Sequence, residues 1–244
     1  MFELSTGNWL LACCAAFMVG FSKTGITGTG MIVIPVMAGI FPAKDSVGIL
    51  LPLLCVGDLF AVIWYKRYAR WPLLLPLIPW VLLGVIVAYL IAGKISSELL
   101  RPVIGLIVIT VLGLALWRER KERSVPLVRW PIAGAVGISA GITTMLANAA
   151  GPIMAIYLLM MRLPMREFIG TGAWYFFLIN LFKIPLMVDL GTIHSASLAF
   201  DLKMTPLVIL GALTGRKLVG VIPEKIFKRC IQVVTFAAAL KLLF

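Results

Sequence analysis

The sequence consists largely of apolar runs long enough to cross a lipid bilayer. A helix needs about 20 consecutive apolar residues to span a hydrocarbon core of roughly 30 Å, and nearly every stretch between charge clusters reaches that length. Hydrophobic residues make up 61% of the 244 residues and charged residues only 13%, whereas soluble domains carry about 25% charged residues. These runs predict a polytopic integral membrane protein with an all-α fold.

Gly, Pro and charged residues divide the chain into apolar segments. The segments cover residues 8–41, 45–65, 72–93, 97–117, 130–161, 166–187, 197–215 and 225–243. Two of them, 8–41 and 130–161, exceed a single crossing, and Gly, Thr, Ala or Asn residues interrupt each near its middle. We therefore expect these two to be broken, re-entrant helical hairpins and the others to be ordinary transmembrane helices.

The two halves of the chain resemble each other. At an offset of 122 residues, Pro42, Lys44, Asp45, Gly48, Asp58, Leu59 and Phe60 match Pro164, Arg166, Glu167, Gly170, Asn180, Leu181 and Phe182. At an offset of 127, Leu83, Gly84, Leu99 and Arg101 match Leu210, Gly211, Ile226 and Lys228. These matches predict two repeats, residues 1–123 and 124–244, each with one broken hairpin followed by three transmembrane helices.

Positive charge gathers on one face if both hairpins are re-entrant. That face then carries Lys66, Arg67, Arg70, Arg118, Arg120, Lys121, Arg123, Arg129, Arg162, Arg166, Arg216, Lys217, Lys225, Lys228 and Arg229, while the other carries Lys44, Lys94, Arg101, Lys203 and Lys241. The positive-inside rule makes the richer face cytoplasmic. With three full crossings per repeat, the second repeat is inverted relative to the first, as in many secondary transporters. The net charge of +12 thus reflects topology, and we expect no nucleic-acid partner.

The two interruptions have the composition of anion-binding tips. The first reads GFSKTGITGTG from Gly20 to Gly30, and the second reads GISAGITTMLANAAGP from Gly137 to Pro152. A new half-helix begins near Gly30 and another near Gly151, and the first turn of a helix presents unpaired N–H groups at the positive end of its dipole. An anion fits such a place. Non-helical backbone at membrane depth must also lie inside the protein or beside a watery cavity.

The candidate substrate-binding residues are the small and polar residues of the two tips, together with one lysine. They are Lys23, Thr24, Gly25, Thr27, Gly28, Thr29 and Gly30 in the first tip, and Thr143, Thr144, Asn148, Ala149, Ala150 and Gly151 in the second. Glycines permit close approach, hydroxyls and amides donate hydrogen bonds, and Lys23 adds a positive charge. Two structural alternatives stay open: the glycines serve only close helix packing, and Lys23 extends to the membrane surface.

Three further polar residues within the apolar segments are candidates for ion coupling. Asp58 and Asn180 occupy matching places in the repeat, deep enough that the carboxylate needs a partner, a proton or water. Asp58 could carry a coupling proton, or it could reach the outer headgroups. Lys183 lies one turn from Asn180 and supplies either a second cation or a structural contact.

Neither the histidine nor the cysteines of this chain have the pattern of a metal or catalytic site. His194 is expected in an exterior loop with Asp189 and Asp201, and a membrane-embedded enzyme would need a base near a nucleophile. The four cysteines lie in apolar segments without metal-type spacing. We expect no metal, no cofactor and no enzymatic activity.

The sequence resembles the sulfite exporter TauE/SafE family, also called the 4-toluene sulfonate uptake permease family. The resemblance rests on GFSKTGITGTG followed by Pro35, on TTMLANAAGP followed by Tyr157 and Leu158, on FIGTGAWYFFLINLFKIP from Phe168 to Pro185, and on GRKLV from Gly215. It covers essentially the whole chain. It implies a multi-pass protein of the plasma membrane, the bacterial inner membrane, that transports small sulfur-containing anions such as sulfite, sulfonates or sulfoacetate, coupled to an ion gradient.

The residues and the resemblance together predict a secondary transporter. A small anion would bind between the two hairpin tips, and rocking of the inverted halves would expose it to either side. A coupling proton is left open, as are the direction of transport and the oligomeric state. The alternatives are a passive anion channel with the same site and, less well supported, a membrane-embedded enzyme.

Overall fold

The protein is described here from a computed structural model. The structure describes residues 4–25, 29–92, 130–219, 221–223, 225–226, 229–230 and 233. In these ranges the chain forms helices, turns and loops, without a strand. The predicted segment 97–117 and most of the segment 225–243 lie outside the described residues.

The described helices follow one another along the chain as two halves. The first half contains α1 (Thr6–Thr24), the short 3-10 helix η1 (Thr29–Ile32), α2 (Val33–Ile40), α3 (Ala43–Tyr65), η2 (Lys66–Tyr68), α4 (Trp71–Leu74) and α5 (Ile78–Ile91). The second contains α7 (Trp130–Ala147), α8 (Gly151–Met160), α9 (Met165–Asp189) and α10 (Ser195–Val219).

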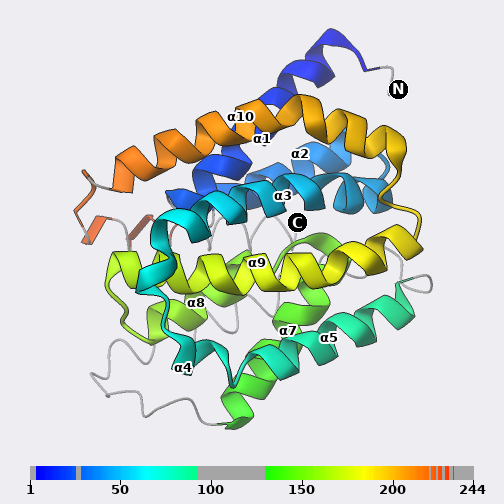
Figure 1. Cartoon of the computed structure of the whole chain (residues 1–244). Helices are drawn as coiled ribbons and strands as arrows, with labels where there is room; N and C mark the ends of the chain where they lie inside the picture. Colours follow the sequence, from blue (N-terminus) through cyan, green and yellow to red (C-terminus); the bar gives the residue numbers. More distant parts are fainter. Residues whose placement is uncertain are drawn as a thin grey trace.

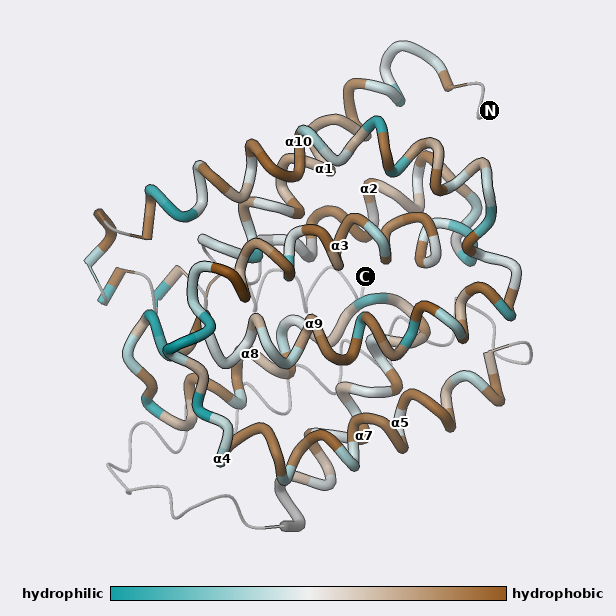
Figure 2. Tube along the Cα trace, in the orientation of Figure 1, coloured by the Kyte–Doolittle hydropathy of each residue, from teal (hydrophilic) through white to brown (hydrophobic). Residues whose placement is uncertain are grey.

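The helices are arranged around a central pair (Figure 1). Helices α3 and α9 pack against each other, α1 packs along α10 on one side of them, and α5 packs along α7 on the other. Each outer pair thus joins one helix from each half. Hydrophobic residues run along α3, α5 and α9, while hydrophilic residues gather where α3 leads into α4 (Figure 2).

Three of the described helices are long and apolar enough to cross a membrane. They are Lys44–Tyr68, Met165–Asp189 and Ser195–Val219. Ile78–Ile91, Ala133–Ala147 and Gly151–Met160 are apolar but shorter. The all-helical fold and the apolar spans are those of a membrane protein.

Both overlong segments are broken near the middle. In the first, α1 ends at Thr24, the backbone of Gly25 leaves helical geometry, and η1 begins at Thr29. In the second, α7 ends at Ala147 and α8 begins at Gly151. In each case the two pieces pack against each other, α1 with α2 and α7 with α8. Each segment is therefore a pair of half-helices.

Glycines bring the outer helix pairs into backbone contact. A Cβ atom added at Gly20 of α1 would lie 1.8 Å from the Val208 carbonyl oxygen of α10. One added at Gly141 of α7 would lie 2.2 Å from the Val81 carbonyl oxygen of α5. No side chain fits at either place. These two glycines serve close helix packing, the structural role that the sequence left open.

One segment and one residue differ from the sequence-based expectation. The apolar run 72–93 is split into α4 and α5 by a turn at residues 75–77. Pro76 explains the split, because proline offers no N–H and disfavours helical geometry in the residue before it. Asp201 does not lie in a loop with His194, since it belongs to α10 and is 4% exposed.

Candidate functional site

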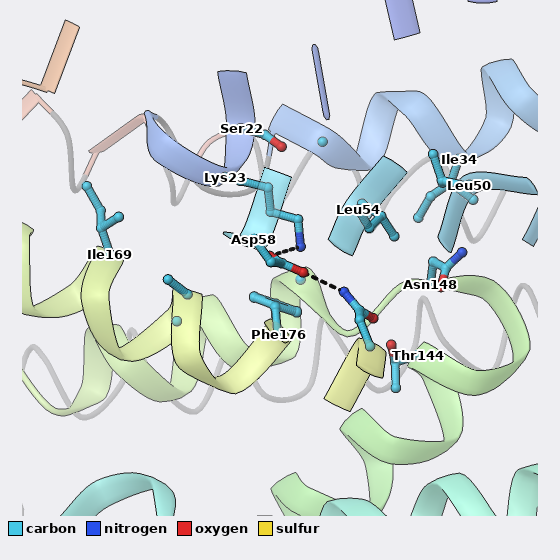
Figure 3. A pocket seen from close by; sticks show the side chains of 15 residues that line it. Ser22, Lys23, Ile34, Leu50, Leu54, Asp58, Thr144, Asn148, Ile169 and Phe176 are labelled. Atoms are coloured by element: carbon cyan, nitrogen blue, oxygen red, sulfur yellow. Dashed lines mark hydrogen bonds and ion pairs between the residues drawn. The ribbon is translucent and has the colours of Figure 1, made fainter. Parts of the chain in front are cut away.

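A cavity lies between the two helix breaks (Figure 3). Its volume is about 70 Å³, well below the roughly 300–1,000 Å³ of sites for drug-sized ligands, so it has room only for a small solute. The lining residues come from both halves: Ser22, Lys23, Gly30, Ile34, Leu50, Leu54, Asp58, Thr144, Asn148, Gly151, Ile169, Gly172, Ala173, Phe176 and Asn180.

Lys23 and Asp58 form an ion pair at the cavity. The Lys23 Nζ atom lies 2.8 Å from Asp58 Oδ1, and the Asn180 amide donates to Asp58 Oδ2 over 2.7 Å. The Asp58 side chain is fully buried, and that of Lys23 is 13% exposed. The two side chains point toward each other in Figure 3. Neither Lys23 nor Asp58 therefore reaches the membrane surface in this structure.

The position of Lys23 depends on its helix and its neighbours. Lys23 lies in the last turn of α1, where the carbonyl end of the helix dipole favours a cation. Its aliphatic stem passes over Gly57 of α3, where an added Cβ would lie 3.0 Å from Lys23 Cγ. The Nζ atom also lies 4.2 Å from the centre of the Phe176 ring, a cation–π distance. The ammonium group is therefore held at the cavity wall.

Lys183 has a different surrounding. It is fully buried in α9, and its Nζ atom donates to the Thr144 carbonyl oxygen at 2.7 Å and to Asn148 Oδ1 at 2.6 Å. The Thr144 hydroxyl lies 3.2 Å away. Among the described residues no carboxylate lies within ion-pair distance of it. Lys183 thus fixes the second helix break behind the cavity wall.

The sequence around Asn148 explains the second break. Asn148 has a φ of 52°, a left-handed conformation that ends helices and that Asn tolerates better than most residues. Its side-chain amide donates to the Val47 carbonyl oxygen of α3 at 2.9 Å. Pro152 then lies in the first turn of α8, where its missing N–H is no loss. Local sequence therefore stops α7 and starts α8 within four residues.

The structure brings together only part of the predicted site. Lys23, Gly30, Thr144, Asn148, Gly151, Asp58 and Asn180 line the cavity. Thr24, Gly25, Thr143, Ala149, Ala150 and Lys183 do not line it. Thr27 and Gly28 lie outside the described residues, and Thr29 begins η1.

The two predicted threonines that do not line the cavity have backbone partners elsewhere. The Thr24 hydroxyl donates to the Ala212 carbonyl oxygen of α10 at 2.7 Å. The Thr143 hydroxyl donates to the Ser139 carbonyl oxygen of its own helix at 2.9 Å. Such bonds satisfy a buried hydroxyl in the absence of any ligand.

Sequence reasoning missed several lining residues. Ser22 is next to Lys23 within the first tip motif, and this position in the sequence could have identified it as a candidate lining residue. Phe176 contacts the Lys23 ammonium, yet a phenylalanine in an apolar span carries no sign of function. The apolar lining residues Ile34 and Leu54 are equally indistinguishable from core residues.

The site and the fold define a class of protein. Two interrupted helices meet at a cavity within an apolar helical bundle. The cavity is lined by a lysine, by two asparagines and by the first residue of a half-helix. This is the architecture of a membrane transporter for a small charged solute.

The comparison with protein families gives the same class. The family model "Sulfite exporter TauE/SafE" matches residues 12–242 of the chain, and the protein therefore belongs to the TauE/SafE family. The family implies a membrane transporter of the sulfite or anion exporter type, and its members are transporters and not enzymes. No curated protein and no solved structure matches the chain.

Proposed function

We propose that this protein is a secondary transporter that moves small sulfur-containing anions, such as sulfite, a sulfonate or sulfoacetate, across the bacterial inner membrane by alternating access. The anion binds in the cavity between the two helix breaks. The observation that carries the proposal is the placement of Lys23 at the wall of an otherwise largely apolar cavity between these breaks.

The contacts of Lys23 and Lys183 favour an anion over a cation or a neutral solute. The cavity wall contains two oppositely charged groups, Lys23 and Asp58, which balance each other. Lys183 lies directly behind Thr144 and Asn148 and, when protonated, adds a further positive charge. The first turn of α8, at Gly151, has no side-chain cap, so its N–H groups add positive potential at the cavity.

The mirrored packing of the two halves supports alternating access. Helix α1 of the first half packs along α10, and α7 of the second half packs along α5. In the predicted repeat α1 corresponds to α7, and α5 corresponds to α10. Asp58 and Asn180, which match at the offset of 122 residues, contact each other directly, as expected of equivalent residues beside a two-fold axis.

Contacts at the two ends of the bundle support hairpins that open in opposite directions. Gly48, at the start of α3, is in contact with Thr192, between α9 and α10. Tyr65, at the other end of α3, is in contact with Gly170 near the start of α9. The first hairpin directly precedes the start of α3 and the second directly precedes the start of α9, so they return to opposite ends.

Binding is tested by the thermal unfolding of purified protein in detergent with sulfite, thiosulfate, sulfoacetate, taurine and phosphate. A ligand at 100 times its Kd stabilises the native state by about 2.7 kcal/mol. We expect at least one sulfur-containing anion to raise Tm, and the Lys23→Ala variant to lose most of that response. The matched control is Lys217→Ala, an exposed lysine of α10, which should respond as the wild type does. An unchanged response in Lys23→Ala would remove Lys23 from the site.

Transport is tested in proteoliposomes. A secondary transporter exchanges labelled anion against unlabelled anion and follows an imposed ion gradient, whereas a passive channel follows only the gradient of the anion itself. Flux that ignores every imposed ion gradient and shows no exchange would favour the channel.

A further inference from the structure

The cavity contains an anion of its own. Asp58 is the single carboxylate among the lining residues, and it already forms an ion pair with Lys23. An incoming anion that is attracted by Lys23 therefore meets a negative charge at contact distance. In a site removed from water, two like charges repel strongly. The substrate cannot simply add to this ion pair.

The two oxygens of Asp58 are bound differently. Oδ2 accepts a hydrogen bond from the Asn180 amide. Oδ1 faces the Lys23 ammonium as an ion pair and accepts no hydrogen bond of good geometry from the described residues. Oδ1 is therefore the oxygen that can take a proton once Lys23 turns away, while Asn180 keeps the carboxyl group in place through Oδ2.

We propose that Asp58 is an internal substitute for the substrate and that the protein takes up one proton on Asp58 for each anion that replaces its carboxylate on Lys23. The proposal rests on the function proposed above. In the binding step a proton forms an O–H bond at Oδ1, the ion pair separates, and the Lys23 ammonium pairs with the substrate anion. The site is neutral before binding, when the Lys23 ammonium faces the Asp58 carboxylate, and neutral after it, when the ammonium faces a monovalent anion and Asp58 is protonated. Release reverses the step and returns the proton.

The other charged and titratable groups near Asp58 fit this exchange. Lys23 faces it from α1, Lys183 and Asn180 from α9, and Cys55 from its own helix α3. Lys183 is held by Thr144 and Asn148, so its Nζ atom stays in place and does not turn toward the ligand. Phe176 remains over Lys23 and limits the distance that the ammonium group can move.

The repeat fixes the stoichiometry at one proton. Asn180 is the residue that corresponds to Asp58 in the second half. An amide does not titrate, so the second half supplies no equivalent proton carrier. A carboxylate at both positions would supply two.

The test uses methanesulfonate as the probe. A sulfonate stays ionised at every pH at which the protein is folded, so any proton taken up on binding belongs to the protein. Binding to the purified full-length protein is measured by calorimetry in buffers of different ionisation enthalpy, which gives the protons bound per anion. We expect close to one for the wild type, with a Kd that rises about tenfold per pH unit where the uptake is complete.

Asp58→Asn is expected to bind methanesulfonate without proton uptake and with a Kd independent of pH. The matched control is Asp201→Asn, which changes another buried carboxyl group, one that has no hydrogen-bond partner among the described residues and does not line the cavity. It should retain the wild-type proton uptake. Loss of uptake in Asp201→Asn together with its retention in Asp58→Asn would overturn the assignment.

Asn180→Asp gives an independent measurement if Asp58→Asn does not fold. It restores a carboxyl group at the equivalent place and should raise the uptake above one proton per anion. An unchanged uptake in this variant, or anion binding by the wild type without any proton uptake, contradicts the inference and leaves the proposed function intact. A wild type that does not bind methanesulfonate at all, or a Lys23→Ala variant that binds it normally, contradicts the proposed function itself.

Discussion

Lys23 and Lys183 are both cations inside the same apolar bundle, yet the two halves of the protein use them differently. In the first half the cation is on the broken hairpin and faces a carboxylate on α3 at the cavity. In the second half the cation is on α9 and is fully enclosed by neutral oxygens of the broken hairpin. A buried charge that faces a separable partner can change partners, whereas one enclosed by backbone and amide oxygens is fixed. We therefore place the proposed exchange in the first half and a supporting role in the second.

The largest effect is expected from breaking the exchangeable pair on one side. Lys23→Met leaves the fully buried Asp58 carboxylate without a counter-ion, which costs about 3–5 kcal/mol of unfolding free energy. The double variant Lys23→Met with Asp58→Asn removes both charges and should lie within about 1 kcal/mol of the wild type. Thermal unfolding in detergent at neutral pH measures both, and the deficit of the single variant should shrink at low pH, because a protonated Asp58 needs no counter-ion. Equal stability of the single and double variants would contradict the buried ion pair.

The support in the second half is tested at Asn148. Asn148→Gly keeps the left-handed backbone but removes the side-chain contacts to Val47 and Lys183, and should lower the unfolding free energy by about 2–3 kcal/mol. Asn148→Ala loses the same contacts and adds about 1–2 kcal/mol of backbone strain. The difference between the two variants in the same unfolding measurement isolates the backbone contribution. If Asn148→Ala is as stable as Asn148→Gly, the left-handed backbone conformation of residue 148 is contradicted.

A smaller effect is expected where the halves pack together. Gly20→Ala and Gly141→Ala both place a methyl group on a facing backbone carbonyl and should each cost about 1–3 kcal/mol. Gly39 of α2 is the control, because a Cβ atom there meets nothing within 4 Å, and Gly39→Ala should be neutral or stabilising by up to about 1 kcal/mol. Comparing the first two variants measures how closely the α1–α10 and α5–α7 contacts correspond. A stable Gly20→Ala protein would argue against backbone contact there.

The smallest effect is expected at an exposed ion pair. Arg70 binds Glu167 through two hydrogen bonds of 2.7 and 2.6 Å, and its side chain is 58% exposed. Water and salt screen such a pair, so Arg70→Ala should leave Tm essentially unchanged. Set beside Lys23→Met, it separates the contribution of burial from that of charge pairing alone. A large loss of stability that persists in high salt would show that this pair holds the two halves together.

Much of the candidate site consists of contacts between residues that are distant in the sequence, and these contacts could not be predicted from it. The asparagine and proline around the second break and the glycines of the first are local signals, and both breaks lie where the sequence indicated. The partners of Asp58 were not predictable, because its contacts to Lys23 and Asn180 join residues 35 and 122 positions apart. The same holds for Thr24 and Thr143, which resemble donors in sequence but bond to nearby carbonyl oxygens.

The sequence by itself determined that the chain is an apolar helical membrane protein of the TauE/SafE family with two interrupted segments, since solvation in lipid and local backbone preferences act residue by residue. Only the tertiary structure decided which polar side chains face the cavity, because that depends on the rotation and spacing of helices packed through glycine contacts. A turn of a helix by a fraction of its circumference would separate Lys23 from Asp58 without changing a single hydrophobic pattern.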